Sequence, residues 1–324
     1  MNRDSSLLEV KDLAIHFPTS RGVLKAVDGV SFDLKYGEVL GLVGESGAGK
    51  SVTGRAIMKL VPPPGKIVSG RVMLEGIDIL TLRDEDLRSV RGKKVALIQQ
   101  DPLSSLNPVF KIKDQIMDIL KLNLGLSHQE AYTIVADLLK EVGIPDSATL
   151  LEKYPHELSG GMRQRVCIAI AFSCTPLLVI ADEPTTAVDV ITQLQIIQLM
   201  RKIQREKHTS ILFITHNLAL ASKICDKIAV MYAGRIVELS LTKKIFESPI
   251  HPYTRALLDA VPRYDAPERL QPIEGDAPNL IDLPTGCSFY PRCREHQSTC
   301  LTIRPSLLEV KPDHYVACQI CNIL

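Results

Sequence analysis

The chain has 324 residues, a formal net charge of +1 and 45% hydrophobic residues. This length suits one large domain with an appendage, or two domains, and the apolar content is ample for a core. A charge so close to neutral does not support wholesale nucleic-acid binding, so we expect no nucleic-acid partner. The first residues are polar, and no stretch approaches the ~18 apolar residues of a membrane span, so we expect the protein to stay in the cytoplasm.

The pattern of apolar residues predicts strands first and alternating helices and strands later. Residues 7–40 and 68–80 predict short strands separated by glycine. Residues 112–142 predict a helical region with a capping box formed by Ser127 and Glu130. From residue 159 onward, helices at about 160–174 and 190–206 alternate with apolar strands at 177–181 and 210–215. This alternation is typical of an α/β protein with a parallel sheet.

The composition changes after about residue 245. Ten of the 20 prolines lie between residues 249 and 312, and five of the eight cysteines lie in the last 38 residues. We expect this part to be an extended tail that wraps or docks rather than a second sheet domain.

A glycine-rich turn between a predicted strand and a helix at about 50–60 fits the pattern G-x-x-x-x-G-K-[ST]. Such a turn surrounds a phosphate with backbone N–H groups, and the following helix adds the positive end of its dipole. We expect Lys50 to reach the β- and γ-phosphates and Ser51 to hold Mg²⁺. The predicted ATP-binding residues of this glycine loop are Gly44, Glu45, Ser46, Gly47, Ala48, Gly49, Lys50, Ser51 and Val52.

Two adjacent carboxylates, Asp182 and Glu183, follow the apolar strand at 177–181. Ligands of open α/β sheets bind at this end of the strands. Asp182 is placed to hold Mg²⁺, and Glu183 is placed to orient an attacking water. A surface acidic turn would give the same pattern, but beside the glycine loop the pair favours a hydrolase.

Six separated motifs occur in the order of the ATP-binding-cassette (ABC) ATPases, which residues 7–245 therefore resemble. They are the glycine loop, "QQDP" (99–102), "LSGGM" (158–162), "ADEP" (181–184), "TTAVD" (185–189) and "THN" (215–217). The resemblance implies a nucleotide-binding domain over residues 1–245, with a RecA-like parallel-sheet core, an N-terminal antiparallel β subdomain and a helical subdomain at about 102–160.

The same resemblance implies further site residues. Gln100 would contact Mg²⁺ or water, His216 would contact the γ-phosphate, and Asp189 would form a contact between two cassettes. Phe17 would stack on adenine, although an aromatic residue at a strand end is more often part of the core. The signature motif would reach the γ-phosphate held by a partner cassette; it comprises Leu158, Ser159, Gly160, Gly161 and Met162.

The clustered cysteines allow three interpretations. Zinc favours closely spaced cysteine pairs, of which only Cys318 and Cys321 form one, and disulfides are disfavoured in the cytoplasm. The third is a [4Fe–4S] cluster held by four thiolates. Residues 246–324 resemble the C-terminal extension of oligopeptide/dipeptide ABC importers, in which four cysteines can carry such a cluster. That resemblance implies Cys287, Cys293, Cys300 and Cys318 as ligands, with Cys321 spare and zinc as the alternative metal.

The cysteines outside this group, Cys167, Cys174 and Cys225, are expected to be buried core thiols. Because the extension lies outside the cassette motifs, we also expect changes within it to leave ATP affinity nearly intact.

The resemblance as a whole implies an ATPase subunit of a peptide-importing ABC transporter, lying peripherally on the cytoplasmic face of the cell membrane. Its implied partners are two integral-membrane permease subunits, a second related ATPase subunit and an extracytoplasmic peptide-binding protein. The chain is expected to be a monomer alone and a dimer with ATP. The alternatives are the cassette of a nickel-type or other solute importer, a soluble non-transport ABC ATPase, and a regulatory module that binds ATP without hydrolysing it.

Overall fold

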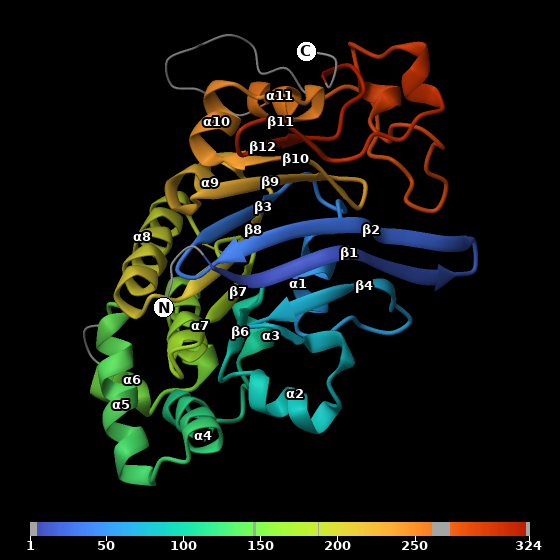
Figure 1. Cartoon of the computed structure of the whole chain (residues 1–324). Helices are drawn as coiled ribbons and strands as arrows, with labels where there is room; N and C mark the ends of the chain where they lie inside the picture. Colours follow the sequence, from blue (N-terminus) through green and yellow to red (C-terminus); the bar gives the residue numbers. More distant parts are fainter. Residues whose placement is uncertain (1–4, 145–146, 187, 261–272, 322–324) are drawn as a thin grey trace. The chain divides into compact units, whose positions relative to one another are not determined.

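The computed structural model describes residues 5–144, 147–186, 188–260 and 273–321 (Figure 1). These residues belong to two compact units. The first unit contains residues 35–38 and 81–214. The second contains the described residues of 6–34, 39–80 and 215–324.

The first unit contains three parallel strands, β6 (Val95–Ile98), β7 (Leu178–Asp182) and β8 (Ser210–Thr215). Every residue of β7 and β8 is buried, which explains why their sequences are apolar rather than alternating. The expected parallel arrangement is therefore confirmed.

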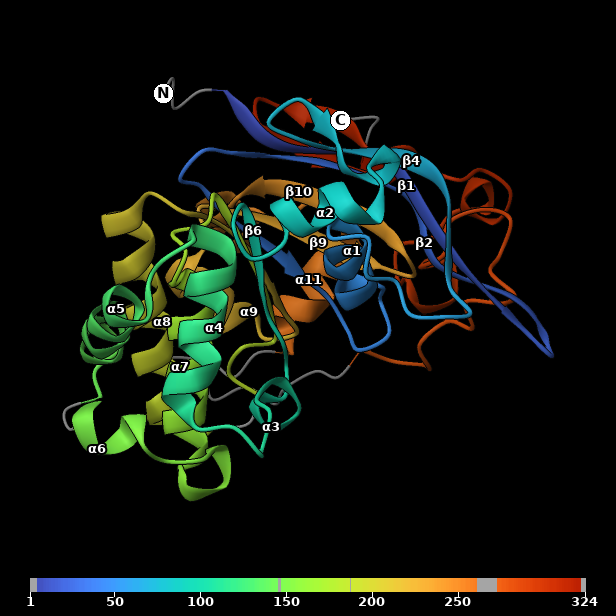
Figure 2. The same ribbon diagram turned by 90° about the horizontal axis from the view of Figure 1, so that it is seen from below.

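Helices account for most of the rest of the first unit. They are α2 (Asp84–Val90), α3 (Pro102–Ser105), α4 (Ile112–Leu124), α5 (His128–Glu141), α6 (Ser147–Leu151), α7 (Gly160–Phe172) and α8 (Val190–Lys207). Figure 2 shows α4, α5, α7 and α8 gathered together. Several of these helices come from residues 102–160, where a helical subdomain is expected.

The helical region predicted at 112–142 consists of two helices. Gly125 adopts the left-handed conformation that ends α4, with φ at 69°. Ser127 then caps α5: its hydroxyl accepts from the Glu130 N–H, and the Glu130 carboxylate accepts from the Ser127 N–H at 2.9 Å. The predicted capping box is confirmed, and it marks the start of the second helix rather than the middle of a continuous one.

The second unit holds a four-stranded sheet in the order β2-β1-β4-β5. The strands are β1 (Ser6–Thr19), β2 (Gly22–Lys35), β4 (Lys66–Leu74) and β5 (Ile77–Asp78), and β1 pairs antiparallel with β4. Strands β1 and β2 have 14 residues each, so the short strands predicted over residues 7–40 are wrong in length. A register shift after Lys11, where Asp12 has a φ of 49°, lets β1 continue through its polar residues as one long strand.

A second sheet of this unit runs β3-β9-β10-β12-β11. Strand β3 (Val39–Val43) is parallel to β9 (Lys227–Tyr232), while β10 (Arg235–Leu241), β12 (His314–Val316) and β11 (Leu308–Lys311) follow in antiparallel order. The helices are α1 (Lys50–Ile57), α9 (Leu218–Ile224), α10 (Thr242–Glu247) and α11 (Pro252–Asp259).

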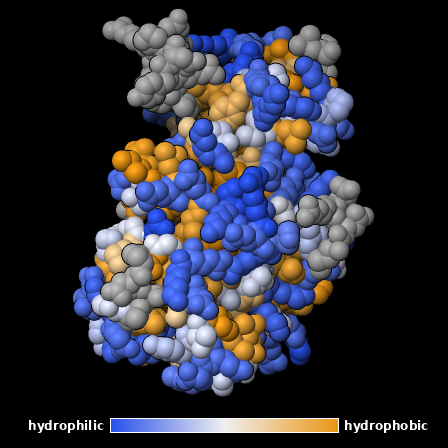
Figure 3. All heavy atoms as spheres, turned by 90° about the vertical axis from the view of Figure 1, so that its left-hand side faces the viewer, coloured by the Kyte–Doolittle hydropathy of each residue, from blue (hydrophilic) through white to orange (hydrophobic). Residues whose placement is uncertain are grey.

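The C-terminal extension, which begins near residue 246, docks as expected, but it does so by adding strands. Residues 314–316 pair with β10, so the edge that β10 would otherwise expose is covered by the extension's own hairpin (Figure 1). Figure 3 shows one face of the molecule, on which hydrophobic residues form separate patches among hydrophilic ones. No helix in the described ranges is long and apolar enough to cross a membrane.

Candidate functional site

The glycine loop follows β3, and its last residues, Lys50 to Val52, form the start of α1. A Cβ atom at Gly44 would collide with the Met231 carbonyl oxygen, and one at Gly49 would collide with the Ala26 carbonyl oxygen. Gly49 also has a φ of 101° and is the N-cap of α1. Glycine is therefore required at both positions by backbone packing as well as by conformation.

Lys50 is 4% exposed, and its ammonium group is aimed back at the loop. Its Nζ donates to the carbonyl oxygens of Gly44 and Glu45, at 2.8 Å each. The lysine charge therefore lies inside the ring of backbone groups formed by the loop. This arrangement fits the predicted contact with phosphate oxygens, which would compete for the same ammonium group.

The extension touches this loop directly. The Glu45 N–H donates to the Tyr253 hydroxyl at 3.0 Å, and the Glu45 carboxylate accepts two hydrogen bonds from Arg292, at 2.8 and 3.0 Å. We expect changes in the extension to leave ATP affinity intact because the extension lies outside the cassette motifs. Since the extension bonds to Glu45 of the glycine loop, that reason no longer holds.

In the first unit, the ends of β6 and β7 bring two predicted catalytic residues together. The Gln100 side-chain N–H₂ donates to the Glu183 carboxylate at 3.3 Å, and the Thr186 hydroxyl donates to the same oxygen at 2.9 Å. Asp182, the last residue of β7, is 3% exposed. The acidic pair is therefore part of an ordered strand end rather than a solvated surface turn.

The backbone of Glu183 is unusual for a residue with a side chain. Its φ is 48°, in the left-handed region that costs a non-glycine residue free energy. Its N–H donates to the Ile214 carbonyl oxygen at 2.9 Å, which holds the turn after β7 against the end of β8. A strained residue that carries a carboxylate at the end of a parallel strand favours a functional role for that side chain.

The signature motif begins α7. The Ser159 hydroxyl accepts from the Met162 N–H at 3.3 Å and caps the helix, Leu158 is buried, and Gly160 and Gly161 form the first turn. A Cβ atom at Gly161 would come within 3.1 Å of the Thr192 methyl carbon. Ser159 is exposed, so the positive end of this helix is accessible to an anion.

Asp189, the residue predicted to contact a second cassette, caps α8. Its carboxylate accepts from the N–H groups of Ile191 and Thr192, at 3.1 and 3.0 Å, and from the Thr192 hydroxyl at 2.6 Å. These hydrogen bonds, led by the Thr192 hydroxyl, lower the pKa of Asp189 below its usual value. The side chain remains exposed, so the capping role does not remove it from a partner's reach.

The remaining two predicted residues lie in the second unit. His216 directly follows β8 and is exposed. Phe17 lies near the end of β1, and a Cβ atom at Gly65 would come within 2.5 Å of its ring. The Phe17 ring therefore packs on a glycine, and its partial exposure leaves the adenine-stacking role as a prediction.

The extension gathers the four cysteines predicted to act as ligands. The Cys287 N–H donates to the Cys300 carbonyl oxygen at 2.8 Å. Burial raises the pKa of the Cys287 thiol to about 11, and the neighbouring Cys300, Cys318 and Cys293 add to this effect. The four thiols therefore lie within electrostatic reach of one another.

Cys321 differs from this group because its thiol has a partner outside it, donating to the Ile250 carbonyl oxygen at 3.5 Å. The neighbouring Cys321 also lowers the pKa of the Cys318 thiol below its usual value. Within the described residues, no group of three or more His, Cys, Asp or Glu side chains is arranged to hold a metal ion. The structure thus gives the predicted metal site a set of neighbouring thiols but no preformed chelate, whether for iron or for zinc.

The three cysteines expected in the core, Cys167, Cys174 and Cys225, are all buried. Burial raises the pKa of Cys167 to about 12. The prediction that these are buried core thiols is therefore confirmed.

Sequence reasoning missed the residues that attach the extension. The buried Glu238 carboxylate accepts from the N–H groups of Ile250 and His251, at 2.8 and 3.0 Å, and lies 2.6 Å from His314 Nε2. The sequence did contain a sign of this attachment in the stretch "HPY" at 251–253. There His251 caps α11 and precedes the proline at its first position. Its partner is a glutamate inside an apolar strand, which no local pattern identifies.

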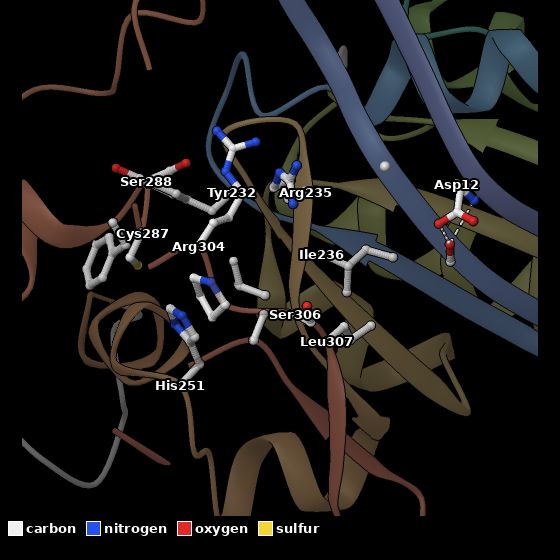
Figure 4. Close-up of a pocket in the computed structure, with 16 residues that line it drawn as sticks. Asp12, Tyr232, Arg235, Ile236, His251, Cys287, Ser288, Arg304, Ser306 and Leu307 are labelled. Atoms are coloured by element: carbon white, nitrogen blue, oxygen red, sulfur yellow. Dashed lines mark hydrogen bonds between the residues drawn. The ribbon is translucent and has the colours of Figure 1, made fainter. Parts of the chain in front are cut away.

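A cavity of about 440 Å³ lies in the second unit beside these residues (Figure 4). Cys287 and His251 line it, as do Arg235 and Arg304. Both arginines donate to Asp28, at 2.9 and 3.0 Å. This shared carboxylate links the extension to β2 and fixes the cavity wall.

Comparison with known proteins gives the family. A family model described as ABC transporter matches residues 27–186, and one described as oligopeptide/dipeptide transporter, C-terminal region, matches residues 237–300. The dipeptide transport ATP-binding protein DppD of Haemophilus influenzae is 46% identical over 93% of this chain and 92% of its own length. The oligopeptide transport ATP-binding protein OppD of Escherichia coli is 45% identical over 97% of this chain and 93% of its own.

The chain belongs to this family of ABC transporter ATP-binding proteins. A solved dimer of the ATP-binding cassette MJ0796 with ADP and Pi, in a post-hydrolysis state, has a TM-score of 0.66 and 25% identity, covering 72% of this chain and 98% of that one. The cassette cbiO1 of Clostridium perfringens has a TM-score of 0.64 and 28% identity, covering 76% and 93%. The predicted ABC cassette fold is confirmed.

Proposed function

We propose that this chain is the ATP-hydrolysing subunit that powers import of di- or oligopeptides through a membrane ABC transporter. The observation that carries the proposal is that the extension, matched by the peptide-transporter family model over residues 237–300, contacts the glycine loop of the cassette. The relatives named for dipeptide and oligopeptide transport share the whole chain, not only the cassette. On this basis residues 1–245 form the nucleotide-binding domain and residues 246–324 the extension.

The catalytic roles follow from the chemistry of each group. The glycine loop would bind the phosphates of ATP through backbone N–H groups and Lys50. Ser51 and Asp182 are the residues that would hold Mg²⁺, which would neutralise charge on the phosphates. Glu183 orients the attacking water, and Gln100, already bonded to Glu183, keeps that carboxylate aligned.

The other site residues act on the same nucleotide or on a second cassette. His216 contacts the γ-phosphate and Phe17 stacks on adenine. The exposed first turn of α7 contacts the γ-phosphate bound by the partner cassette, and Asp189 supports that interface. The chain alone is then a monomer with weak ATPase activity, and ATP favours the dimer. Strong ATPase activity that does not depend on protein concentration would contradict this assembly.

Two membrane-spanning permease subunits receive the motion through the segment that follows Gln100. Leu103, Val109 and Phe110 in this segment are exposed, at 55%, 71% and 52%. Exposed apolar side chains directly after a residue that contacts Glu183 suit a docking surface coupled to hydrolysis. The protein therefore lies peripherally on the cytoplasmic face of the membrane, with an extracytoplasmic peptide-binding protein supplying substrate.

The test of peptide import is reconstitution with the permeases and the second ATPase subunit in proteoliposomes. We expect ATP hydrolysis to rise when a peptide-loaded binding protein is added and to be unaffected by the peptide-free form. Stimulation by a nickel-loaded binding protein instead would establish the solute-importer alternative. Steady ATPase activity without any permease would favour a non-transport ATPase.

We further propose that Cys287, Cys293, Cys300 and Cys318 hold a [4Fe–4S] cluster, with zinc as the alternative. Four neighbouring thiols fit this donor set, and a cluster is larger than one ion, so its thiolates need not form the tight chelate of a single metal. Iron and zinc analysis of anaerobically purified protein tests this. We expect about four irons per chain, lost in Cys300→Ser and kept in Cys321→Ser. One zinc and no iron from iron-replete cells would overturn the cluster.

A further inference from the structure

The contact between the extension and Glu45, the second residue of the glycine loop, is built from both the side chain and the backbone. Arg292 is the last residue of a short helical turn (Tyr290–Arg292) between Cys287 and Cys293, and its guanidinium holds the Glu45 carboxylate in a two-bond fork. The Arg292 side chain is 6% exposed and that of Glu45 26%. Such a fork fixes geometry as well as charge, which an exposed ion pair does not do.

The remaining donors of Arg292 hold it in place. Its Nε donates to the Glu274 carbonyl oxygen at 3.0 Å, and its Nη2 donates to the Ile273 carbonyl oxygen at 3.4 Å. The guanidinium also lies 5.9 Å from the centre of the Tyr232 ring. These contacts fix the Arg292 side chain independently of Glu45. Forming the two hydrogen bonds to Glu45 therefore costs little side-chain entropy.

A cluster of three aromatic rings supports the same loop residue. Tyr232, Tyr253 and Phe289 lie with ring centres 4.5 to 5.3 Å apart. Tyr232 belongs to β9, while Tyr253 and Phe289 belong to the extension. From this cluster the Tyr253 hydroxyl accepts the Glu45 N–H, so the rigid rings position a backbone group of the loop.

We propose that Arg292 and Tyr253 are positioning residues of the nucleotide site, through which the extension holds the glycine loop in its phosphate-binding shape. The inference rests on the proposed binding of ATP by that loop. Glu45 lies 208 residues from Tyr253 and 247 residues from Arg292, so the two contacts unite distant parts of the chain.

Calorimetric titration of the full chain with MgATP tests this, in a Glu183→Gln background that prevents turnover. We expect Arg292→Gln to raise the Kd for MgATP at least about fivefold, the lower end of typical coupling between sites. Arg292→Lys keeps the charge but loses the fork and recovers only part of the affinity. The matched control is Arg294→Gln, because Arg294 is 64% exposed and pairs with a 75% exposed Glu274.

A double-mutant cycle separates positioning from general damage. In a Glu45→Gln chain, Arg292→Gln should change the Kd by less than twofold, because its partner is already gone. An arginine that merely stabilises the extension would raise the Kd equally with and without Glu45. Equal effects in the two backgrounds therefore overturn the proposal.

Tyr253→Phe is the second variant, and it serves if Arg292→Gln does not fold. It removes one hydroxyl and keeps the ring packing, and we expect the Kd to rise about two- to tenfold, the range of one neutral hydrogen bond. Native affinity in both Arg292→Gln and Tyr253→Phe would overturn the inference. Absence of MgATP binding by the unsubstituted chain would instead overturn the proposed function.

Discussion

The glycine loop and the C-terminal extension belong to the same compact unit, but contacts of different range hold them. Within the loop, Lys50 bonds to Gly44 and Glu45, and Thr53 bonds to Gly49, all within six residues. The extension is held by His314 on Glu238, Arg292 on Glu45 and Arg304 on Asp28, which lie 76, 247 and 276 residues apart. Substitutions in the cassette motifs should therefore remove activity, whereas substitution of the buried Glu238, which only anchors the extension, should remove structure.

The largest expected effect is on turnover. Glu183→Gln removes the carboxylate that orients water, and we expect ATP hydrolysis by the assembled transporter to fall about 10²- to 10⁴-fold, while MgATP binding and thermal stability are kept. Turnover is measured by phosphate release and binding by calorimetry. Hydrolysis at the native rate would remove Glu183 from its role.

The opposite pattern is expected for Glu238→Ala. Removing a buried carboxylate that holds two backbone N–H groups and His314 should destabilise the extension by about 3–5 kcal/mol. Limited proteolysis should then cut the extension while the rest of the chain resists. Glu274→Ala is the control, because that carboxylate is exposed and should contribute at most about 1 kcal/mol. Equal protease resistance in the two variants would show that Glu238 does not anchor the extension.

Lowering the pH should also destabilise the extension. Burial lowers the pKa of His251 to about 4 from its usual 6.5, against the opposing charge of Glu238 and with the help of Arg255. Below about pH 6.5, His251 binds a proton in the unfolded chain but not in the folded chain. The free energy of unfolding therefore falls as the pH drops toward 4, by up to about 3 kcal/mol.

Glu238 acts in the same direction. Burial alone would raise its pKa, but the hydrogen bonds from His314 and its other partners outweigh burial and lower it, so its contribution is lost only below its usual pKa of 4.5. Protease sensitivity of the extension measured from pH 7.5 to 4.5 therefore tests the effect of His251. In His251→Asn, whose amide oxygen can keep the cap, the sensitivity should depend less on pH, and an unchanged profile would exclude His251 as the cause.

The smallest effect is expected from a purely local signal. Ser127→Ala removes the capping box of α5 and should cost about 1 kcal/mol of stability. Thermal unfolding measures this change. The control is Thr133→Ala, because Thr133 has an exposed hydroxyl that donates to the Gln129 carbonyl oxygen one turn earlier in the same helix. A loss above about 3 kcal/mol would show that even this helix start depends on distant contacts.

The sequence by itself determined the features whose causes are local. The glycine motif, the capping box at Ser127 and the apolar strands β7 and β8 each appear within one short stretch of sequence, so they can be recognised without the fold, although the fold adds distant groups that touch the loop. The sequence also placed Glu183 at the end of a strand, and the parallel sheet, through β6, then brought the Gln100 side chain to it.

Only the tertiary structure decided how the extension is held and what it touches. Glu238 stands in an apolar strand, and Arg292 stands between two cysteines, so neither side chain reveals its partner through spacing or periodicity. Their hydrogen bonds form because β12 pairs with β10 and the aromatic cluster lies under the glycine loop. Long-range pairing of this kind depends on which surfaces meet once the chain is folded, and a one-dimensional pattern does not contain that information.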